Sequence, residues 1–218
     1  LFPGGREIPF KGTTFSQKIA LTQEWLDEGL NDIYEATFEY DGVLVMVDVL
    51  HKKSNGSFEI YEVKSSTEAK DIFRHDASIQ YYVLNGLGYD VSDVYITILN
   101  TDYIRDDELD VQQLFIHVKV TDDVLALQGD IPATLGKFRE TLTDRVNEPD
   151  IDIGRHCKKP YPCDAIDYCW KRQRDIPEYS VFDIFQMNQT PKSVQLYKDG
   201  IVAVEDIPDD MKLTDIQQ

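Results

Sequence analysis

Two glycine-containing turns around an apolar run constrain the fold of this chain more than any other feature. Residues 43–50 consist of Val, Leu and Met with a single Asp, and Asp41-Gly42 precedes this run while Asn55-Gly56 follows it. Turns of this composition join neighbouring antiparallel strands. The pattern therefore predicts three consecutive strands, near 33–40, 43–51 and 58–64.

Asp48 is the charged residue of the apolar run. A carboxylate in such a strand is costly to bury unless another group pairs with it. A two-residue turn at Asp41-Gly42 places Glu35 directly opposite Asp48. Because like charges opposite each other destabilise a sheet, this pair indicates a bound cation.

The second turn leaves two registers open. A tight two-residue turn would place Asp48 opposite Val63, on the wrong face of the sheet. A three-residue loop with Gly56 in the left-handed conformation places Asp48 opposite Glu62. The three-residue loop therefore predicts a row of three carboxylates across three strands, with Lys64 two residues farther along the same face.

These residue types suit a divalent-metal site for phosphodiester cleavage. Mg²⁺ and Mn²⁺ prefer oxygen ligands, and the predicted ligands are Asp48, Glu62, the backbone carbonyl of Val63, and Glu35. Lys64 is the predicted catalytic lysine, since an ammonium group can position a water molecule and offset charge on the phosphate. Alternating charges on a strand also occur on solvated faces, so Glu62 and Lys64 could instead be surface residues.

The rest of the chain alternates helical and strand patterns. Apolar residues recur at helical spacing in 13–29 and 67–86, while 91–99 and 112–120 are typical of strands. A second long helix is predicted over 122–146, with an interruption near the Gly-Asp-Ile-Pro segment at 129–132. This order predicts an α/β fold with a mixed central sheet flanked by helices.

Three cysteines, Cys157, Cys163 and Cys169, lie within thirteen residues. So few cysteines in a chain of 218 residues do not suggest a disulfide scaffold. Their grouping indicates a bound metal or cluster in a reducing compartment, so we expect a cytoplasmic protein.

The order of these motifs resembles that of the PD-(D/E)XK nucleases. Asp48, then Glu62-Val63-Lys64, then Gln80 on the next helix follow the order of that family's motifs. The later cysteine group is similar to that of the RecB-type and CRISPR-associated exonucleases that carry an iron–sulfur cluster. The segments 2–5 and 33–38 also resemble a bacterial domain family of unknown function with this nuclease core.

The resemblance implies a fold and an activity. It implies a restriction-endonuclease-like nuclease core over 1–150, then a cysteine module at 151–175, then a small helical appendage or linker at 176–218. The implied activity is that of a metal-dependent deoxyribonuclease, in which Gln80 joins Asp48, Glu62 and Lys64 at the catalytic site. DNA, single-stranded or at its ends, is the expected partner.

The resemblance also implies a cofactor and a longer chain. The cysteine group would bind a 4Fe-4S cluster, or zinc where the ligand set is incomplete. A fourth cysteine is expected upstream of Leu1, and a further domain is expected downstream.

Two alternatives to an active nuclease stay open, and the charge of the chain favours the first of them, while the cysteine segment favours the second. Forty acidic and 22 basic residues give a net charge of −18, whereas proteins that bind nucleic acid usually show a basic surface. The chain could therefore be a catalytically inactive nucleic-acid-binding or scaffold domain on the same fold. It could also be a zinc-stabilised interaction module. No apolar run is long enough to span a membrane, so no membrane partner is expected.

Overall fold

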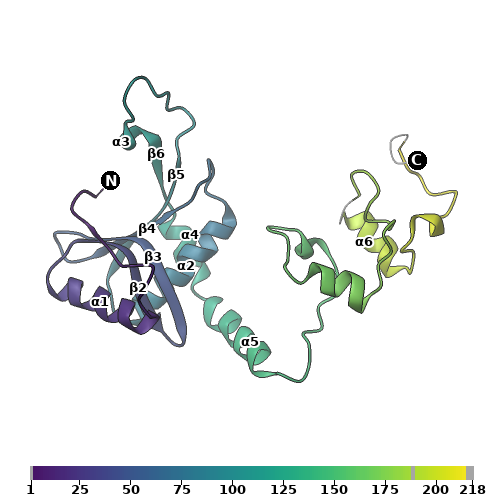
Figure 1. Cartoon of the computed structure of the whole chain (residues 1–218), viewed down its shortest axis with the longest axis horizontal. Helices are drawn as coiled ribbons and strands as arrows, with labels where there is room; N and C mark the ends of the chain where they lie inside the picture. Colours follow the sequence, from purple (N-terminus) through teal and green to yellow (C-terminus); the bar gives the residue numbers. More distant parts are fainter. Residues whose placement is uncertain (1, 188–189, 215–218) are drawn as a thin grey trace. The chain divides into compact units, whose positions relative to one another are not determined.

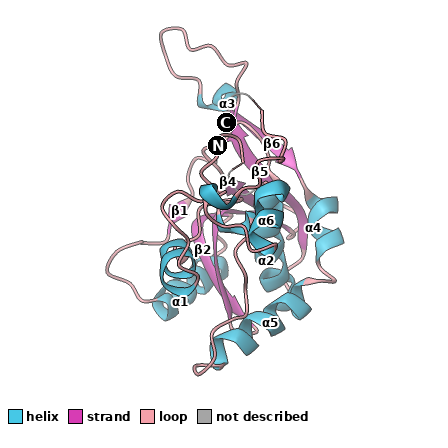
Figure 2. Ribbon diagram, turned by 90° about the vertical axis from the view of Figure 1, so that its right-hand side faces the viewer, coloured by secondary structure: helices cyan, strands magenta, loops and turns pink. Residues whose placement is uncertain are grey.

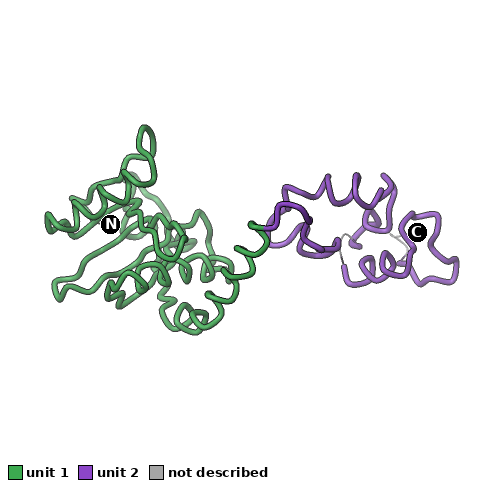
Figure 3. Tube along the Cα trace, turned by 90° about the horizontal axis from the view of Figure 1, so that it is seen from below, with its two compact units in different colours: residues 1–143 green, residues 144–218 purple. Residues whose placement is uncertain are grey.

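The computed structural model describes residues 2–187 and 190–214, and the chain forms two compact units, Leu1–Thr143 and Asp144–Gln218 (Figure 3). We expected boundaries near residues 150 and 175. The structure places its boundary after Thr143, and residues on both sides of position 175 share one hydrophobic core, in which Cys157 lies in the same buried cluster as Phe182.

Unit 1 is built on a six-stranded sheet (Figure 1). Neighbours in the sheet are also neighbours in sequence. The β1–β2 and β4–β5 pairs are parallel, whereas the other three pairs are antiparallel. The strands are β1 (Arg6–Glu7), β2 (Asp32–Tyr40), β3 (Val43–Lys52), β4 (Phe58–Val63), β5 (Val91–Leu99) and β6 (Phe115–Lys119).

The register of the β2–β3–β4 meander follows the turns. Tyr40 pairs with Val43, as a two-residue turn requires. At the second turn the N–H of Lys53 donates to the carbonyl of Ser57 at 2.8 Å. The loop therefore has three residues, and its last, Gly56, has a φ of +90° that suits glycine. The three-residue register predicted from the sequence is confirmed.

The described residues of unit 1 form five helices. The predicted mixed α/β core with flanking helices is confirmed, and the interruption predicted near 129–132 separates two of the helices. The helices are α1 (Phe15–Asp27), α2 (Asp71–Gly86), α3 (Val111–Leu114), α4 (Thr121–Leu127) and α5 (Ile131–Thr143).

The prediction that a strand begins at residue 112 is wrong. Residues Val111–Leu114 form the helical turn α3, and β6 begins at Phe115. The carboxylate of Asp110 accepts hydrogen bonds from the N–H groups of Gln112 and Gln113. This capping satisfies amide groups that a strand would have paired, so it favours the helical turn.

Helix α1 covers the outer edge of β2. Its buried residues are Lys18, Thr22 and Leu26, rather than the more apolar positions that its sequence pattern favours. The hydroxyl of Thr22 accepts a hydrogen bond from the N–H of Thr37 at 3.0 Å. The helix thus satisfies a backbone donor on the strand edge, which explains why a polar residue is buried there.

Helix α2 is the crossover between the parallel strands β4 and β5 and packs against strands β2 to β5 (Figure 2). At its last residue, Gly86, an added Cβ would lie 2.2 Å from the ring of Tyr40. Only glycine allows this approach. The close packing fixes α2 against the sheet and thereby places its side chains over the ends of β3 and β4.

Unit 2 is made of short helical turns around its own small core. These are η1 (Arg155–Cys157), η2 (Tyr168–Gln173), α6 (Pro191–Lys198) and η3 (Val204–Asp206). The largest buried side chain of this core is Phe182, which packs against the ring of Trp170 at 4.8 Å between centroids. In the part of the chain that the structure describes, no helix is both long and apolar enough to cross a bilayer.

Candidate metal centre

The candidate site lies where the pairing of β3 and β4 ends. Regular pairing runs from Lys52 opposite Phe58 to Val49 opposite Tyr61. Asp48 is the next residue, and its Oδ2 atom accepts a hydrogen bond from the N–H of Val63 at 2.7 Å. The carboxylate therefore takes the place of a backbone acceptor and is held at the end of β4.

Glu62 follows Tyr61, the last residue of β4 that pairs regularly with β3, and is only 4% exposed. Its Oε1 atom lies 2.5 Å from the Nζ atom of Lys64, and its Oε2 atom accepts a hydrogen bond from Nε2 of Gln80 at 2.6 Å. Burial and the charge of Asp48 raise the pKa of Glu62 to about 7, although both hydrogen bonds oppose this. Glu62 is thus a buried carboxylate that a cation would stabilise in its charged form.

Gln80 brings an unused acceptor to the same place. The side chain is 4% exposed, and its Oε1 atom is buried without a hydrogen-bond partner among the described residues. A buried acceptor without a donor is costly. Because Nε2 of this amide binds Glu62, a cation or a water molecule beside Glu62 is well placed to satisfy Oε1.

Lys64 links the strand to helix α2. Its Nζ atom lies 2.7 Å from Oδ2 of Asp76 and 5.4 Å from the ring centre of Phe73, both on α2. Burial lowers the pKa of Lys64, but the hydrogen bonds to Asp76 and Glu62 outweigh it and raise the pKa above its usual value. Lys64 is therefore an ammonium ion at neutral pH.

Glu35 lies between two residues of β2 that pair with β3, since Tyr34 pairs with Val49 and Ala36 pairs with Val47. This places Glu35 across from Asp48. Its own pairing is interrupted, since its φ is +58°, a left-handed conformation that costs a non-glycine residue about 1 kcal/mol or more. Burial and then the charge of Asp48 raise the pKa of Glu35. Glu35 is thus an electrostatic neighbour of the site, and its role as a ligand stays a prediction.

Two residues of this site were missed by the sequence analysis. Asp76 had a usable signal, because it precedes Gln80 by four residues and so shares its face of the helix. Lys18 of α1 gave no such signal, because a single lysine on a helix is usually exposed to solvent. It is 3% exposed, and its Nζ atom lies 3.8 Å from the sulfur of Met46, which is on the same face of β3 as Asp48.

The charges at this site favour a cation. Burial, with a smaller contribution from the charge of Asp76, raises the pKa of Asp48, and the hydrogen bond from Val63 and the charge of Lys64 only partly offset this. Among residues 2–187 and 190–214, no three His, Cys, Asp or Glu side chains form a complete metal-binding group. Two carboxylates are enough for Mg²⁺, which usually keeps several water molecules. The residues present therefore fit a divalent cation held by Asp48 and Glu62.

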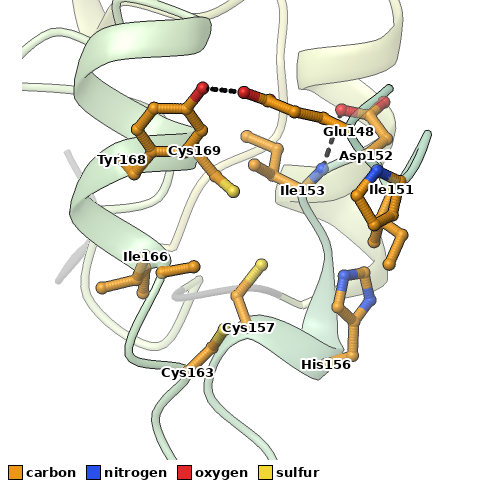
Figure 4. Close-up of a pocket in the computed structure, with 12 residues that line it drawn as sticks. Glu148, Ile151, Asp152, Ile153, His156, Cys157, Cys163, Ile166, Tyr168 and Cys169 are labelled. Carbon is orange, nitrogen blue, oxygen red and sulfur yellow. Dashed lines mark hydrogen bonds between the residues drawn. The ribbon is translucent and has the colours of Figure 1, made fainter. Parts of the chain in front are cut away.

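The three cysteines gather in unit 2. Cys157 is buried, Cys163 is exposed, Cys169 is half-buried, and all three are free thiols. They line one cavity of about 320 Å³, and the sulfurs of Cys157 and Cys169 extend into it (Figure 4). Its other walls are largely apolar, from residues such as Ile153 and Ile166. Sulfur donors are the ligand type that iron and zinc favour. In the described residues the three thiols are not arranged as a complete metal-binding group, so a bound metal or cluster stays a prediction.

Comparisons with known proteins add no family. No protein-family model matches the chain, and a search of curated proteins finds no match either. The function is therefore inferred from the residues of the site.

Proposed function

We propose that unit 1 is a metal-dependent nuclease domain of the PD-(D/E)XK type, with a restriction-endonuclease-like core, that hydrolyses phosphodiester bonds in DNA. The observation that carries this proposal is the connected set of Asp48, Glu62, Lys64 and Gln80 at the end of one strand pair. Two carboxylates, an ammonium group and an amide in this arrangement suit the charges of a phosphodiester and of the cation that accompanies it.

The proposed roles follow from the contacts. Asp48, Glu62 and the carbonyl of Val63 would hold Mg²⁺ or Mn²⁺, with Glu35 beside them. The bound ion would polarise the phosphate and lower the pKa of a water molecule. Gln80 fixes the rotamer of Glu62 through its hydrogen bond. Lys64, as an ammonium ion, offsets negative charge on the phosphate rather than removing a proton from water.

Calorimetry with Mn²⁺, followed by an assay on single- and double-stranded DNA, tests the proposal. Asp48→Asn should abolish Mn²⁺ binding at this site and lower cleavage by at least ~10³-fold, because it removes a ligand whose metal supplies several kcal/mol of transition-state stabilisation. Asp93→Asn is the matched control, since Asp93 also lies on a strand of the sheet but pairs with Lys53 and Lys119 instead.

Two results would contradict a nuclease. Metal binding without cleavage in the presence of DNA favours an inactive binding or scaffold domain on the same fold. Equal Mn²⁺ binding by the wild type and by Asp48→Asn removes Asp48 from the metal site.

A second proposal concerns unit 2, where the cysteines form a metal-binding module. The shared cavity of Cys157, Cys163 and Cys169 supports it. Anaerobic reconstitution with iron and sulfide should give the broad visible absorption of a cluster, and Cys157→Ser should reduce it. Stoichiometric zinc in the purified protein, with no iron uptake, would favour a zinc-stabilised interaction module instead.

A further inference from the structure

Two carboxylates hold the ammonium group of Lys64. Oε1 of Glu62 lies 2.5 Å from Nζ, and Oδ2 of Asp76 lies 2.7 Å from it. The two partners differ in setting, because the side chain of Glu62 is 6% exposed and that of Asp76 is 48% exposed. Glu62 also lies on the same strand end as Lys64, whereas Asp76 belongs to helix α2. The lysine is thus held from two independent elements.

Helix α2 contacts both charged residues of the strand end separately. Asp76 and Gln80 are one helical turn apart, so they project from the same face of α2. Asp76 pairs with Lys64, while Gln80 donates to Oε2 of Glu62 at 2.6 Å. Helix α2 therefore contacts the carboxylate of Glu62 through Gln80 and the ammonium group of Lys64 through Asp76. Because two different side chains make these contacts, one can break while the other stays.

A cation at Glu62 would compete with Lys64 for the same carboxylate. Coordination draws the electron density of Glu62 toward the metal, and the ammonium group is repelled by the added positive charge. A lysine side chain that loses its partner regains most of its rotamer freedom. Without a second anchor, Lys64 would then leave the position that the proposed chemistry requires.

We propose that Asp76 is a positioning residue that keeps the ammonium group of Lys64 at the site when Glu62 is engaged by a cation. This inference rests on the nuclease function proposed above for the role of the cation. It assigns no ligand role to Asp76, since its Oδ2 atom is already taken up by Lys64. Helix α2 then has a function in addition to packing, because one of its faces fixes both the carboxylate of Glu62 and the ammonium group of Lys64.

Nuclear magnetic resonance on the full 218-residue chain, with ¹⁵N-labelled lysine, tests the contact without an activity assay. An ammonium group held in hydrogen bonds exchanges its protons slowly and gives an observable ¹H–¹⁵N signal. Lys64→Arg assigns that signal. Glu62→Gln replaces the engaged carboxylate by a neutral group, so no metal is needed.

The expected result is that the Lys64 signal persists in Glu62→Gln and in wild type with saturating Mg²⁺. It should disappear in the double variant Glu62→Gln/Asp76→Asn and in Asp76→Asn with saturating Mg²⁺. Asp71→Asn is the matched control, because Asp71 starts the same helix and pairs with Arg74 rather than with Lys64. Asp76→Glu keeps the charge and should keep the signal. Persistence of the signal in Asp76→Asn with Glu62 neutralised would overturn the inference, as would its loss in Glu62→Gln alone.

Kinetics then separate positioning from stability. Asp76→Asn should lower kcat by ~10–100-fold, the usual cost of a supporting contact at a metal site, with KM for DNA and Mn²⁺ affinity within about two-fold. Asp76→Glu should restore most of kcat. A loss of Mn²⁺ affinity in Asp76→Asn would show that Asp76 is a ligand and would overturn the positioning role. If the wild type neither binds metal nor cleaves DNA, the nuclease proposal fails, while the signal still decides whether Asp76 holds Lys64.

Discussion

Unit 1 and unit 2 each bring together side chains of the types that bind metals, but by different means. In unit 1 the charged groups come from two neighbouring strands and a helix, and Asp48 and Glu62 already have hydrogen-bond partners. In unit 2 the three cysteines lie within thirteen residues and line an apolar cavity as free thiols. The comparison teaches that a hard-ligand site can be prepared by sheet register, whereas a soft-ligand site can be assembled by local turns. The two sites should therefore respond to different changes.

The largest expected effect separates the two units. Asp48→Asn should lower DNA cleavage by at least ~10³-fold, for the loss of several kcal/mol of metal stabilisation, and leave iron uptake by the cysteines unchanged. Replacement of all three cysteines by serine should abolish iron uptake and leave DNA cleavage unchanged. Parallel cleavage assays and visible absorption spectra check this. Loss of both properties in either variant would mean that the sites are coupled, and the comparison would fail.

The next effect concerns the ammonium group. Lys64→Met should lower kcat by ~10²–10³-fold, as expected for removing one electrostatic contact to a reacting phosphate. Mn²⁺ affinity should stay the same or increase, because the competitor for Glu62 is gone. Single-turnover kinetics and calorimetry measure the two quantities. Lys53→Met is a control, since Lys53 pairs with Glu59 and Asp93 outside the site.

The pH dependence should distinguish Glu62 from an ordinary surface carboxylate. Since its pKa is raised to about 7, the apparent Mn²⁺ affinity should weaken about tenfold for each pH unit below 7, because the proton competes with the metal. Without metal, the contribution of Glu62 to stability is present below pH 4.5 and is lost as the pH rises through 7. Calorimetry and thermal melts between pH 5 and 8 check both. A pH-independent affinity would place the metal elsewhere.

The cysteines should differ from one another in their effect on stability. Cys157→Ser should lower the free energy of unfolding by about 1–3 kcal/mol, because it places a hydroxyl in the core of unit 2. Cys163→Ser should change it by less than about 0.5 kcal/mol, since Cys163 is exposed. Chemical denaturation of the metal-free protein measures both. Equal losses would indicate that the metal-free module is packed around all three thiols.

The smallest effect is expected at Lys18. No carboxylate lies within 4 Å of its ammonium group in the described part of the chain, and the side chain is 3% exposed. Lys18→Met should therefore be neutral or stabilise the fold by about 1 kcal/mol, because a buried charge is removed. Lys11→Met at an exposed position is the control. A clear loss of stability would show that the charge of Lys18 is needed by Glu35.

The local sequence determined much of unit 1. The turns at 41–42 and 54–56 set the register, because side chains alternate with a period of two and each turn length allows one pairing. The predicted loop length is confirmed, but regular pairing of β3 with β4 ends at Val49 opposite Tyr61, one residue before Asp48 and Glu62. That Asp48 faces Glu62 stays a prediction. The sequence also predicted the break between α4 and α5, where glycine and proline interrupt the helical pattern.

Tertiary packing decided what the pattern could not show. The partner of Lys64 on helix α2, Asp76, depends on the angle at which α2 crosses the sheet, and Gly86 against Tyr40 sets that approach. The burial of Lys18 and Thr22 depends on the strand edge beneath α1, which an apolar periodicity cannot reveal. The joining of residues 151–175 and 176–214 around Phe182 likewise needed long-range packing. Sequence fixes local register, but contacts between elements arise only when their surfaces meet.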